Sequence, residues 1–192
     1  KVMTVIRPAL PEDVAFLAKV VAVAASLVTM EELQENVSDE RLKVMEELCA
    51  SDWSLYSWQR AITAVDQESG RSVGCIISYD GAIYEKARAL TFSYAEKRLG
   101  KNFGTTDTET RPGEYYLDSM AILPEFRGEK LGQRLMNAAM EVAARQGHKK
   151  VTLIADKHAP RLRAYYSQLG FKEVEEISFF DHPYIRMVKD II

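Results

Sequence analysis

Short apolar runs alternate along this chain with longer stretches of helical periodicity, a pattern typical of a mixed α/β fold. Strands are predicted over residues 5–7, 59–66, 71–79 and 151–155, with a central strand from residue 115 and two closing strands after residue 170. Helices are predicted over residues 14–28, 42–49, 81–99, 129–146 and 160–169. No segment resembles a linker rich in Gly and Ser, so we expect one domain over residues 1–192.

The first predicted helix is apolar on more than one side. We expect it to begin at Pro11, with Glu12 and Asp13 in its first turn. These two acids argue against a signal peptide, and the apolar run is too short to span a bilayer. The helix is therefore expected to be buried deeply or covered by the segment that follows it.

Residues 26–60 contain a capping box at Thr29 and Glu32, and then the apolar stripe of a further helix. A cluster of large side chains follows at Trp53, Leu55, Tyr56 and Trp58. Such a cluster forms either a small core or the floor of a substrate site. Both interpretations are kept.

The segment 117–132, LDSMAILPEFRGEKLG, is a strand that enters a Pro-containing turn and then the first turn of a helix. A glycine-bearing loop at a helix N-terminus presents unpaired backbone N–H groups at the positive end of the helix dipole, which favours a phosphate or pyrophosphate. The segment has neither the GK[ST] of a Walker loop nor the G-x-G-x-x-G of a dinucleotide fold. On pattern alone it is either an anion site or an ordinary strand-to-helix turn.

The elements after this loop predict a parallel strand pair. Gly147 stands at the end of the helix, and the short apolar run 151–155 is typical of a strand buried on both faces. A strand, a helix and a second strand of this kind imply a right-handed crossover. A second helix then opens near Pro160 and closes at Gly170.

Two spaced motifs, M-A-I-L-P-E-F-R-G-E-K-L-G and A-Y-Y-S-Q-L-G-F, resemble the GNAT superfamily of acyl-coenzyme A-dependent N-acyltransferases. The resemblance is strong over residues 115–175, looser over 6–17 and the closing strands, and absent over 26–60. It implies a twisted, mostly antiparallel sheet with a central parallel, splayed strand pair, flanked by helices. The segment 26–60 would then be a helical insertion in the domain.

The resemblance also implies roles for particular residues. The strand at Met120, Ala121 and Ile122 would bulge and bind the pantetheine arm, and the loop would bind the pyrophosphate of acetyl-CoA. The residues implied in cofactor binding are Met120, Ala121, Ile122, Arg127, Gly128, Glu129, Lys130, Leu131, Gly132, Ala159 and Arg163. Two of them depart from the family pattern, because Lys130 replaces a glycine and Ala159 replaces an asparagine.

The chemistry of amine acylation requires a base for the attacking amine and a proton or hydrogen bond for the departing thiolate. Tyr166 matches the family tyrosine that donates to the leaving sulfur. Asp118 is unusual inside a strand, so it is either a general base or an acid held by neighbouring hydrogen bonds. Glu114 and Tyr116 are further candidates for proton handling. Alternation would place Tyr116, Asp118, Met120 and Ile122 on one face of the strand.

The composition of the chain limits the classes of partner and cofactor that we expect. A net charge of −3 with interspersed cations argues against a nucleic-acid surface. Cys49 and Cys75 form neither a disulfide framework nor a metal set, which indicates a reduced cytoplasmic compartment, and Cys75 is expected to be an inert core thiol. The three histidines have no metal-ligand spacing, so no metal is expected. The polar stretch 101–113 is predicted to be a surface loop and a candidate lid.

These observations together predict an N-acetyltransferase that moves an acetyl group from acetyl-CoA to a primary amine by direct attack. The acceptor is a small-molecule or peptide amine, with no membrane partner. The alternative is a non-catalytic coenzyme A sensor or protein-interaction module, which the changes at Lys130 and Ala159 would favour. The apolar first helix and the final strand, 184–188, are each candidates for a homodimer contact.

Overall fold

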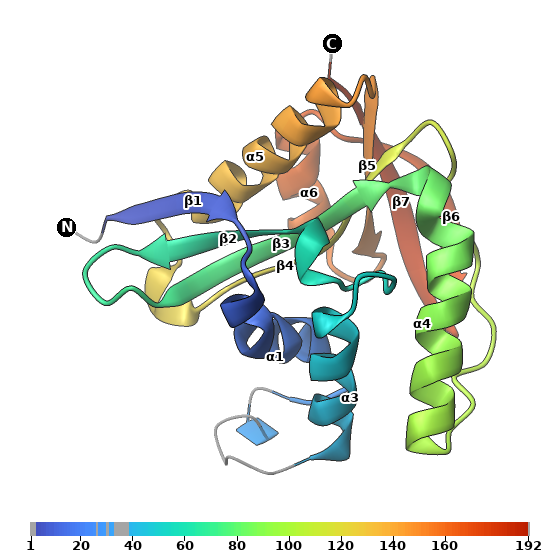
Figure 1. The fold of residues 1–192 in the computed structure, drawn as a ribbon. Coiled ribbons are helices and arrows are strands. Elements are labelled where there is room, and N and C mark those ends of the chain that lie inside the picture. The colour runs from blue at the N-terminus through green and yellow to red at the C-terminus, as the bar shows by residue number, and fades with distance from the viewer. Residues whose placement is uncertain (1–2, 26, 30, 33–38, 192) are drawn as a thin grey trace.

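The computed structural model describes residues 3–25, 27–29, 31–32 and 39–191. Its centre is a seven-stranded sheet in the order β1-β2-β3-β4-β5-β7-β6 (Figure 1). The strands are β1 Thr4–Pro8, β2 Ala61–Asp66, β3 Ser72–Asp80, β4 Tyr115–Ile122, β5 Lys150–Asp156, β6 Lys172–Phe179 and β7 His182–Asp190. All neighbours pair antiparallel except β4 and β5, which are parallel. The predicted fold class is confirmed.

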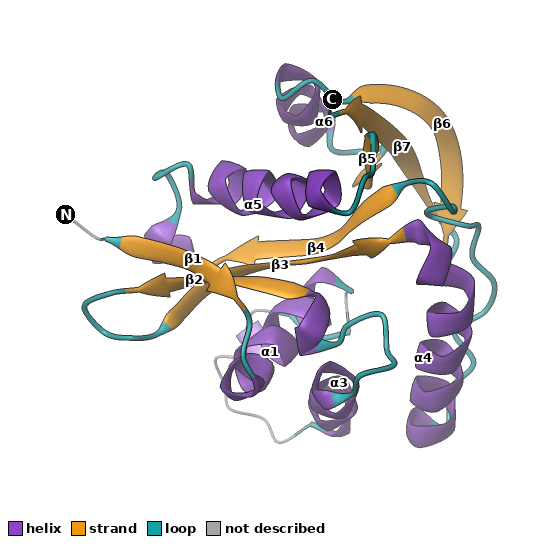
Figure 2. Ribbon diagram, turned by 45° about the horizontal axis from the view of Figure 1, so that its top comes forward, coloured by secondary structure: helices purple, strands orange, loops and turns teal. Residues whose placement is uncertain are grey.

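Helices cover both faces of this sheet and bury a separate apolar core on each (Figure 2). One face carries α1 Val14–Ala24, α3 Glu40–Ala50 and α4 Tyr84–Leu99. The other face carries α5 Leu131–Arg145 and α6 Pro160–Gln168. Within the described residues, no helix has the length and apolar character needed to cross a membrane.

The apolar helix α1 is enclosed between α3 and the sheet, as its sequence predicted. It ends at Ala24, four residues earlier than expected, because the chain reverses there. The backbone N–H groups of Leu27 and Val28 both donate to the carbonyl of Ala22. The predicted capping box is present, since the side chains of Thr29 and Glu32 each accept the other's backbone N–H, at 3.1 and 2.7 Å.

Strand β4 contains a bulge at Asp118. Ser119 pairs with Ile77 and Leu117 pairs with Ser78, so Asp118 has no partner residue on β3. The bulge lies two residues before the predicted position at Met120, and it reverses the alternation of side chains. Tyr116 packs in the core under α1 and α4, whereas Met120 and Ile122 pack in the core under α5. The prediction that these three residues share one face is therefore wrong.

Beyond this bulge β4 parts from β5. The two strands pair only at Tyr115 with Val151 and Tyr116 with Thr152, although β4 continues to Ile122 and β5 to Asp156. The predicted splay of the parallel pair is confirmed. It leaves the β5-facing backbone groups of the last residues of β4 without a strand partner, and it opens a gap through the middle of the sheet.

The segment 101–113 is anchored to the domain at several points. Asp107 donates its backbone N–H to the carbonyl of Ser178 and accepts the N–H of Ser178 in return, at 2.9 and 2.7 Å. Arg88 on α4 bonds the carbonyl of Thr106. Glu109 and Thr110 are buried, so the prediction of a surface loop is wrong for this part of the segment.

Candidate active site

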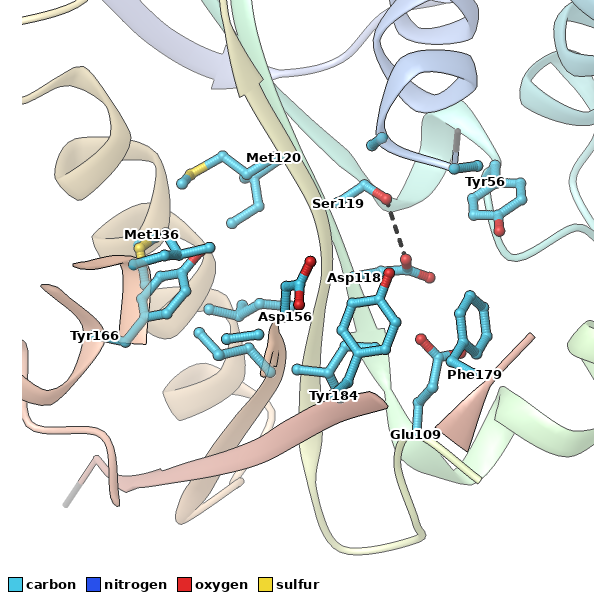
Figure 3. A pocket seen from close by; sticks show the side chains of 18 residues that line it. Tyr56, Glu109, Asp118, Ser119, Met120, Met136, Asp156, Tyr166, Phe179 and Tyr184 are labelled. Carbon is cyan, nitrogen blue, oxygen red and sulfur yellow. Dashed lines mark hydrogen bonds between the residues drawn. The ribbon is translucent and has the colours of Figure 1, made fainter. Parts of the chain in front are cut away.

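A cavity of about 290 Å³ fills the gap between β4 and β5. Met120, Met136 and Tyr166 line it from the α5 side of the sheet, and Tyr56, Asp118 and Glu109 line it from the α1 side (Figure 3). The cavity therefore connects the two faces of the sheet at the point where the parallel pair separates. The two predicted catalytic residues, Tyr166 and Asp118, therefore line the same cavity.

Asp118 occupies the bulge of β4, where its carboxylate accepts two hydrogen bonds. The hydroxyl of Tyr79 donates to Oδ2 at 2.6 Å, and the hydroxyl of Ser119 donates to Oδ1 at 3.1 Å. Desolvation raises the pKa of Asp118, and the two hydroxyl donors oppose that rise because they favour the charged form. Asp118 thus has the hydrogen-bonded environment that a strand Asp requires, and it also faces the cavity.

Glu109 is a second carboxyl group in the same cavity, and the sequence analysis did not identify it as a candidate. The Tyr84 hydroxyl donates to Oε2 at 2.6 Å, and the Tyr116 hydroxyl donates to Oε1 at 2.7 Å. Burial raises the pKa of Glu109, and the negative charge of Asp118 raises it further. Tyr116, predicted as a proton-handling group, instead positions this carboxyl group. Glu109 was missed because a Glu in the polar stretch KNFGTTDTET has the pattern of a solvated loop residue.

Tyr166 lies on α6, where its ring packs against Phe171 at a centroid distance of 6.0 Å. Burial raises the pKa of the Tyr166 hydroxyl above its ordinary value, which already lies well above neutral pH, so the hydroxyl is protonated. The side chain is half-buried and lines the cavity. A protonated hydroxyl in this place suits a proton donor.

A second, more open cavity of about 620 Å³ lies along the loop between β4 and α5. Met120, Ala121 and Ile122 line it from the strand, and Arg127, Gly128, Lys130, Leu131 and Gly132 line it from the loop. Among the described residues, no backbone carbonyl or side chain accepts a hydrogen bond from the N–H groups of residues 128–133. These unpaired donors at the start of a 15-residue helix have the arrangement that the predicted anion site requires, and anion binding stays a prediction.

Lys130 adopts the backbone conformation that the family glycine would have. Its φ is +56° and its ψ is +22°, in the left-handed region, and it is the N-cap residue of α5. Gly128 also has a positive φ, of 97°. Lys130 therefore holds a left-handed conformation at a conformational cost that glycine does not pay.

Three residues implied in cofactor binding line neither cavity: Glu129, Ala159 and Arg163. Arg163 donates to Glu173 and to the carbonyl of Lys157, at 2.7 and 2.8 Å, and Ala159 is the N-cap of α6. Their roles stay predictions. The fallback candidate Glu114 also lies outside the cavities, where the buried side chain of Arg186 donates to it at 2.7 Å.

The cysteines are buried on the α1 side of the sheet. Burial raises the pKa of Cys49 to about 12 and raises that of Cys75 further, so both are protonated thiols. Cys75 is therefore the inert core residue that its apolar surroundings predicted. In the part of the chain that the structure describes, no three His, Cys, Asp or Glu side chains are grouped to hold a metal ion.

Comparison with known proteins places these features in a family. Residues 29–171 match the profile of the Acetyltransferase (GNAT) family. A stretch of 59 residues, 31% of this chain, is 34% identical to the uncharacterized N-acetyltransferase YhfO of Bacillus subtilis (strain 168), and it spans 40% of that protein.

Solved structures match over nearly the whole chain. An N-acetyltransferase from Staphylococcus aureus Mu50 superposes with a TM-score of 0.78 at 23% identity, covering 96% of this chain and 99% of the other. A crystal structure described only as an acetyltransferase superposes with a TM-score of 0.76 at 26% identity, covering 98% of this chain and 100% of the other.

Proposed function

Because this chain belongs to the GNAT family of acetyltransferases, we propose that it moves an acetyl group from acetyl-CoA to a primary amine by direct attack. The observation that carries the proposal is the cavity through the parted β4–β5 pair. It brings a carboxylate, Asp118, and a protonated phenol, Tyr166, into one desolvated space. Acyl transfer to an amine requires both kinds of group.

The residues along the second cavity fit acetyl-CoA. The unpaired N–H groups of residues 128–133, with Arg127 and Lys130 beside them, suit the pyrophosphate. The β4 backbone at Met120, Ala121 and Ile122 has no β5 partner, so it is available to hydrogen-bond the amides of the pantetheine arm. When bound, the coenzyme supplies the acetyl group as a thioester.

Asp118 and Tyr166 have separate tasks in this proposal. An amine enters as an ammonium ion and must lose a proton before it can attack, and Asp118 accepts that proton. The raised pKa of Asp118 brings its basicity closer to neutral pH. Tyr166 donates the proton that the departing sulfur requires. The phenol is protonated at neutral pH, and it regains a proton when the attacking nitrogen loses its second proton as the amide forms.

Direct attack is favoured because neither cysteine is available as an acyl carrier. Cys49 and Cys75 are buried protonated thiols, and neither lines the two cavities. A protein incubated with acetyl-CoA alone is therefore expected to remain unacetylated on cysteine when it is analysed by mass spectrometry. Acetylated Cys49 or Cys75 would overturn direct attack.

The melting temperature of the purified protein, with and without excess acetyl-CoA, tests cofactor binding. A ligand at about 100 times its Kd stabilises a fold by about 2.7 kcal/mol, which gives a clear upward shift. Adenosine 3′,5′-bisphosphate is the control for binding of the nucleotide end alone, and it should give a smaller shift. Absence of any shift at saturating acetyl-CoA would mean that Lys130 and Ala159 have removed the cofactor site, and the proposal would fail.

A further inference from the structure

A third cavity, of about 430 Å³, extends from the active-site cavity on the α1 side of the sheet. The two share Ala25, Tyr56 and Phe179 as lining residues, so they adjoin one another on the α1 side of the sheet. Figure 3 shows Tyr56 and Phe179 beside Asp118 and Glu109, on the side of β4 opposite Tyr166. A molecule whose amine lies at Asp118 therefore has its remaining atoms directed toward this third cavity.

The walls of the third cavity are apolar and aromatic. Phe92 of α4, Phe103 of the following loop and Phe180 of the β6–β7 turn enclose it, with ring centroids 5.4 Å apart for Phe92 and Phe180 and 6.2 Å apart for Phe103 and Phe180. Leu48 and Met45 of α3 lie in its wall as well. Among the described lining residues Lys101 is the only charged one, and it is exposed. The described lining residues therefore offer apolar contact and no carboxylate.

Phe180 occupies a position where a phenylalanine is costly. Phe179 pairs with His182, so Phe180 and Asp181 form a two-residue turn, and their φ angles are +49° and +61°. Turns of this kind favour Asn-Gly, because both central residues need a positive φ. A bulky residue in the left-handed region is an outlier whose conformational cost points to a functional constraint. Here the turn places the Phe180 ring over the cavity.

We propose that the acceptor is a primary monoamine carrying a ring-sized apolar group, bound with its ammonium between Asp118 and Glu109 and its apolar group among Phe92, Phe103 and Phe180. The carboxylate of Asp118 attracts one cationic nitrogen, and the buried carboxyl group of Glu109 lines the same cavity and can accept a hydrogen bond from the ammonium. A polyamine or a lysine-like acceptor would place a second cation in an apolar space beside Lys101, where it has no counter-charge. This inference rests on the proposed acetyl transfer and specifies its acceptor.

The test measures thiol release from acetyl-CoA with three amines: 2-phenylethylamine, ethylamine and spermidine. The wild-type protein is expected to show a kcat/KM for 2-phenylethylamine about tenfold or more above that for either other amine. A single additional methylene that packs in an apolar pocket already raises kcat/KM about 10-fold or more, and a phenyl ring is larger. A preference for spermidine, or equal rates with all three amines, would overturn the inference.

Two variants test whether the aromatic rings cause the preference for 2-phenylethylamine. Phe180→Ala and Phe92→Ala should each lower the ratio of kcat/KM for 2-phenylethylamine to kcat/KM for ethylamine about tenfold, mainly by raising the KM for 2-phenylethylamine, because ethylamine has no ring to pack against these side chains. Leu90→Ala, at an exposed position of α4 outside the cavities, is the matched control. If both phenylalanine variants keep the wild-type ratio between the two amines, the aromatic cavity does not bind the acceptor.

Failure of this inference is distinguishable from failure of the proposed function. Turnover of spermidine or of a peptide amine, with none of 2-phenylethylamine, would overturn the acceptor class and leave acetyl transfer standing. No turnover of any amine, together with no melting shift from acetyl-CoA, would overturn both.

Discussion

Tyr166 brings a protonated hydroxyl to the cavity from α6, and a change of one oxygen atom tests its role. We expect Tyr166→Phe to lower kcat by about 10² to 10⁴, the range attributed to a positioned proton donor. The melting shift caused by acetyl-CoA should persist, because the ring and its contact with Phe171 remain. Tyr94→Phe, at a half-buried position of α4 outside the cavities, where the hydroxyl donates to Glu47, is the matched control for loss of a phenol. Full activity in Tyr166→Phe would exclude the phenol as the proton donor.

Lys130 has a positive φ, which costs a lysine more free energy than it costs a glycine. A substitution by glycine should therefore change the stability of the fold. The left-handed conformation costs a non-glycine residue about 1–2 kcal/mol, and the greater chain entropy of unfolded glycine offsets about half of that. Lys130→Gly should therefore raise the free energy of unfolding by up to about 1 kcal/mol, measured by urea denaturation. Lys149→Gly, at an exposed position with a negative φ, should lower it. A destabilised Lys130→Gly would mean that side-chain contacts outweigh the backbone strain.

Residues of the site differ in how far the sequence could identify them. Asp118 was found because an acid is rare inside a strand, and Tyr166 because it stands in a spaced motif. Glu109 carries no such local signal, since its burial depends on Tyr84 and Tyr116, which reach it from other elements. Contacts between residues distant in the chain were beyond any pattern in the local sequence.

The helices and strands also differ in whether nearby or distant residues in the chain determine them. Helix α5 follows its predicted periodicity, and α4 and α5 both end next to the glycines that predicted their ends, because these signals lie within a few turns of the helix. Strand β4 was placed correctly, but its bulge was predicted at Met120 and lies at Asp118. A bulge depends on register against β3, and alternation in one strand does not contain that information.

Gly81 lies so close to the backbone of residues 110–111 that only a glycine fits there. It starts the turn into α4, and a Cβ built on it would lie 2.1 Å from the carbonyl oxygen of Arg111. Gly81→Ala should therefore push residues 110–111 away and lower the free energy of unfolding by about 2 kcal/mol or more. Glu109, two residues before Arg111, should shift with them, so activity should fall as well.

Ala82→Ser, at the adjacent exposed position, is the control for Gly81→Ala and should lie within about 0.5 kcal/mol of the wild type. Urea denaturation measures both variants. If Gly81→Ala is as stable and as active as the wild type, the contact between the turn and the 101–113 segment does not hold Glu109 in place.

On the scale of the whole molecule, the sheet separates two cores and the parted strands join them. The α5 side carries the loop proposed for the cofactor, the α1 side carries the two acids and the aromatic cavity, and the gap beyond Tyr116 lies between them. The apolar surfaces of α1 and β7, considered for a homodimer, are accounted for within the chain, since α3 covers α1 and β7 pairs with strands on both sides. Dimer formation stays a prediction.

The two carboxyl groups in this central gap couple the stability of the fold to pH. Burial raises the pKa of Glu109 above its ordinary value near 4.5, so between that value and the raised one the folded protein holds a proton that the unfolded chain has released. The folded state then binds more protons, and the free energy of unfolding falls as pH rises through this interval. Each unit of pKa difference corresponds to about 1.4 kcal/mol.

Glu109→Gln removes this ionisation while keeping a side chain that can hydrogen-bond the two tyrosines. Relative to the wild type, the variant should become progressively more stable as pH rises from about 5 to about 9, because it has no carboxyl group to deprotonate in the buried site. Thermal unfolding across this range measures the difference between the two proteins. Glu141→Gln, at an exposed position of α5, should instead follow the wild type at every pH. If the Glu109→Gln curve runs parallel to the wild-type curve, the buried Glu109 does not hold its proton in the folded protein, and the acid pair bears two negative charges when the amine arrives.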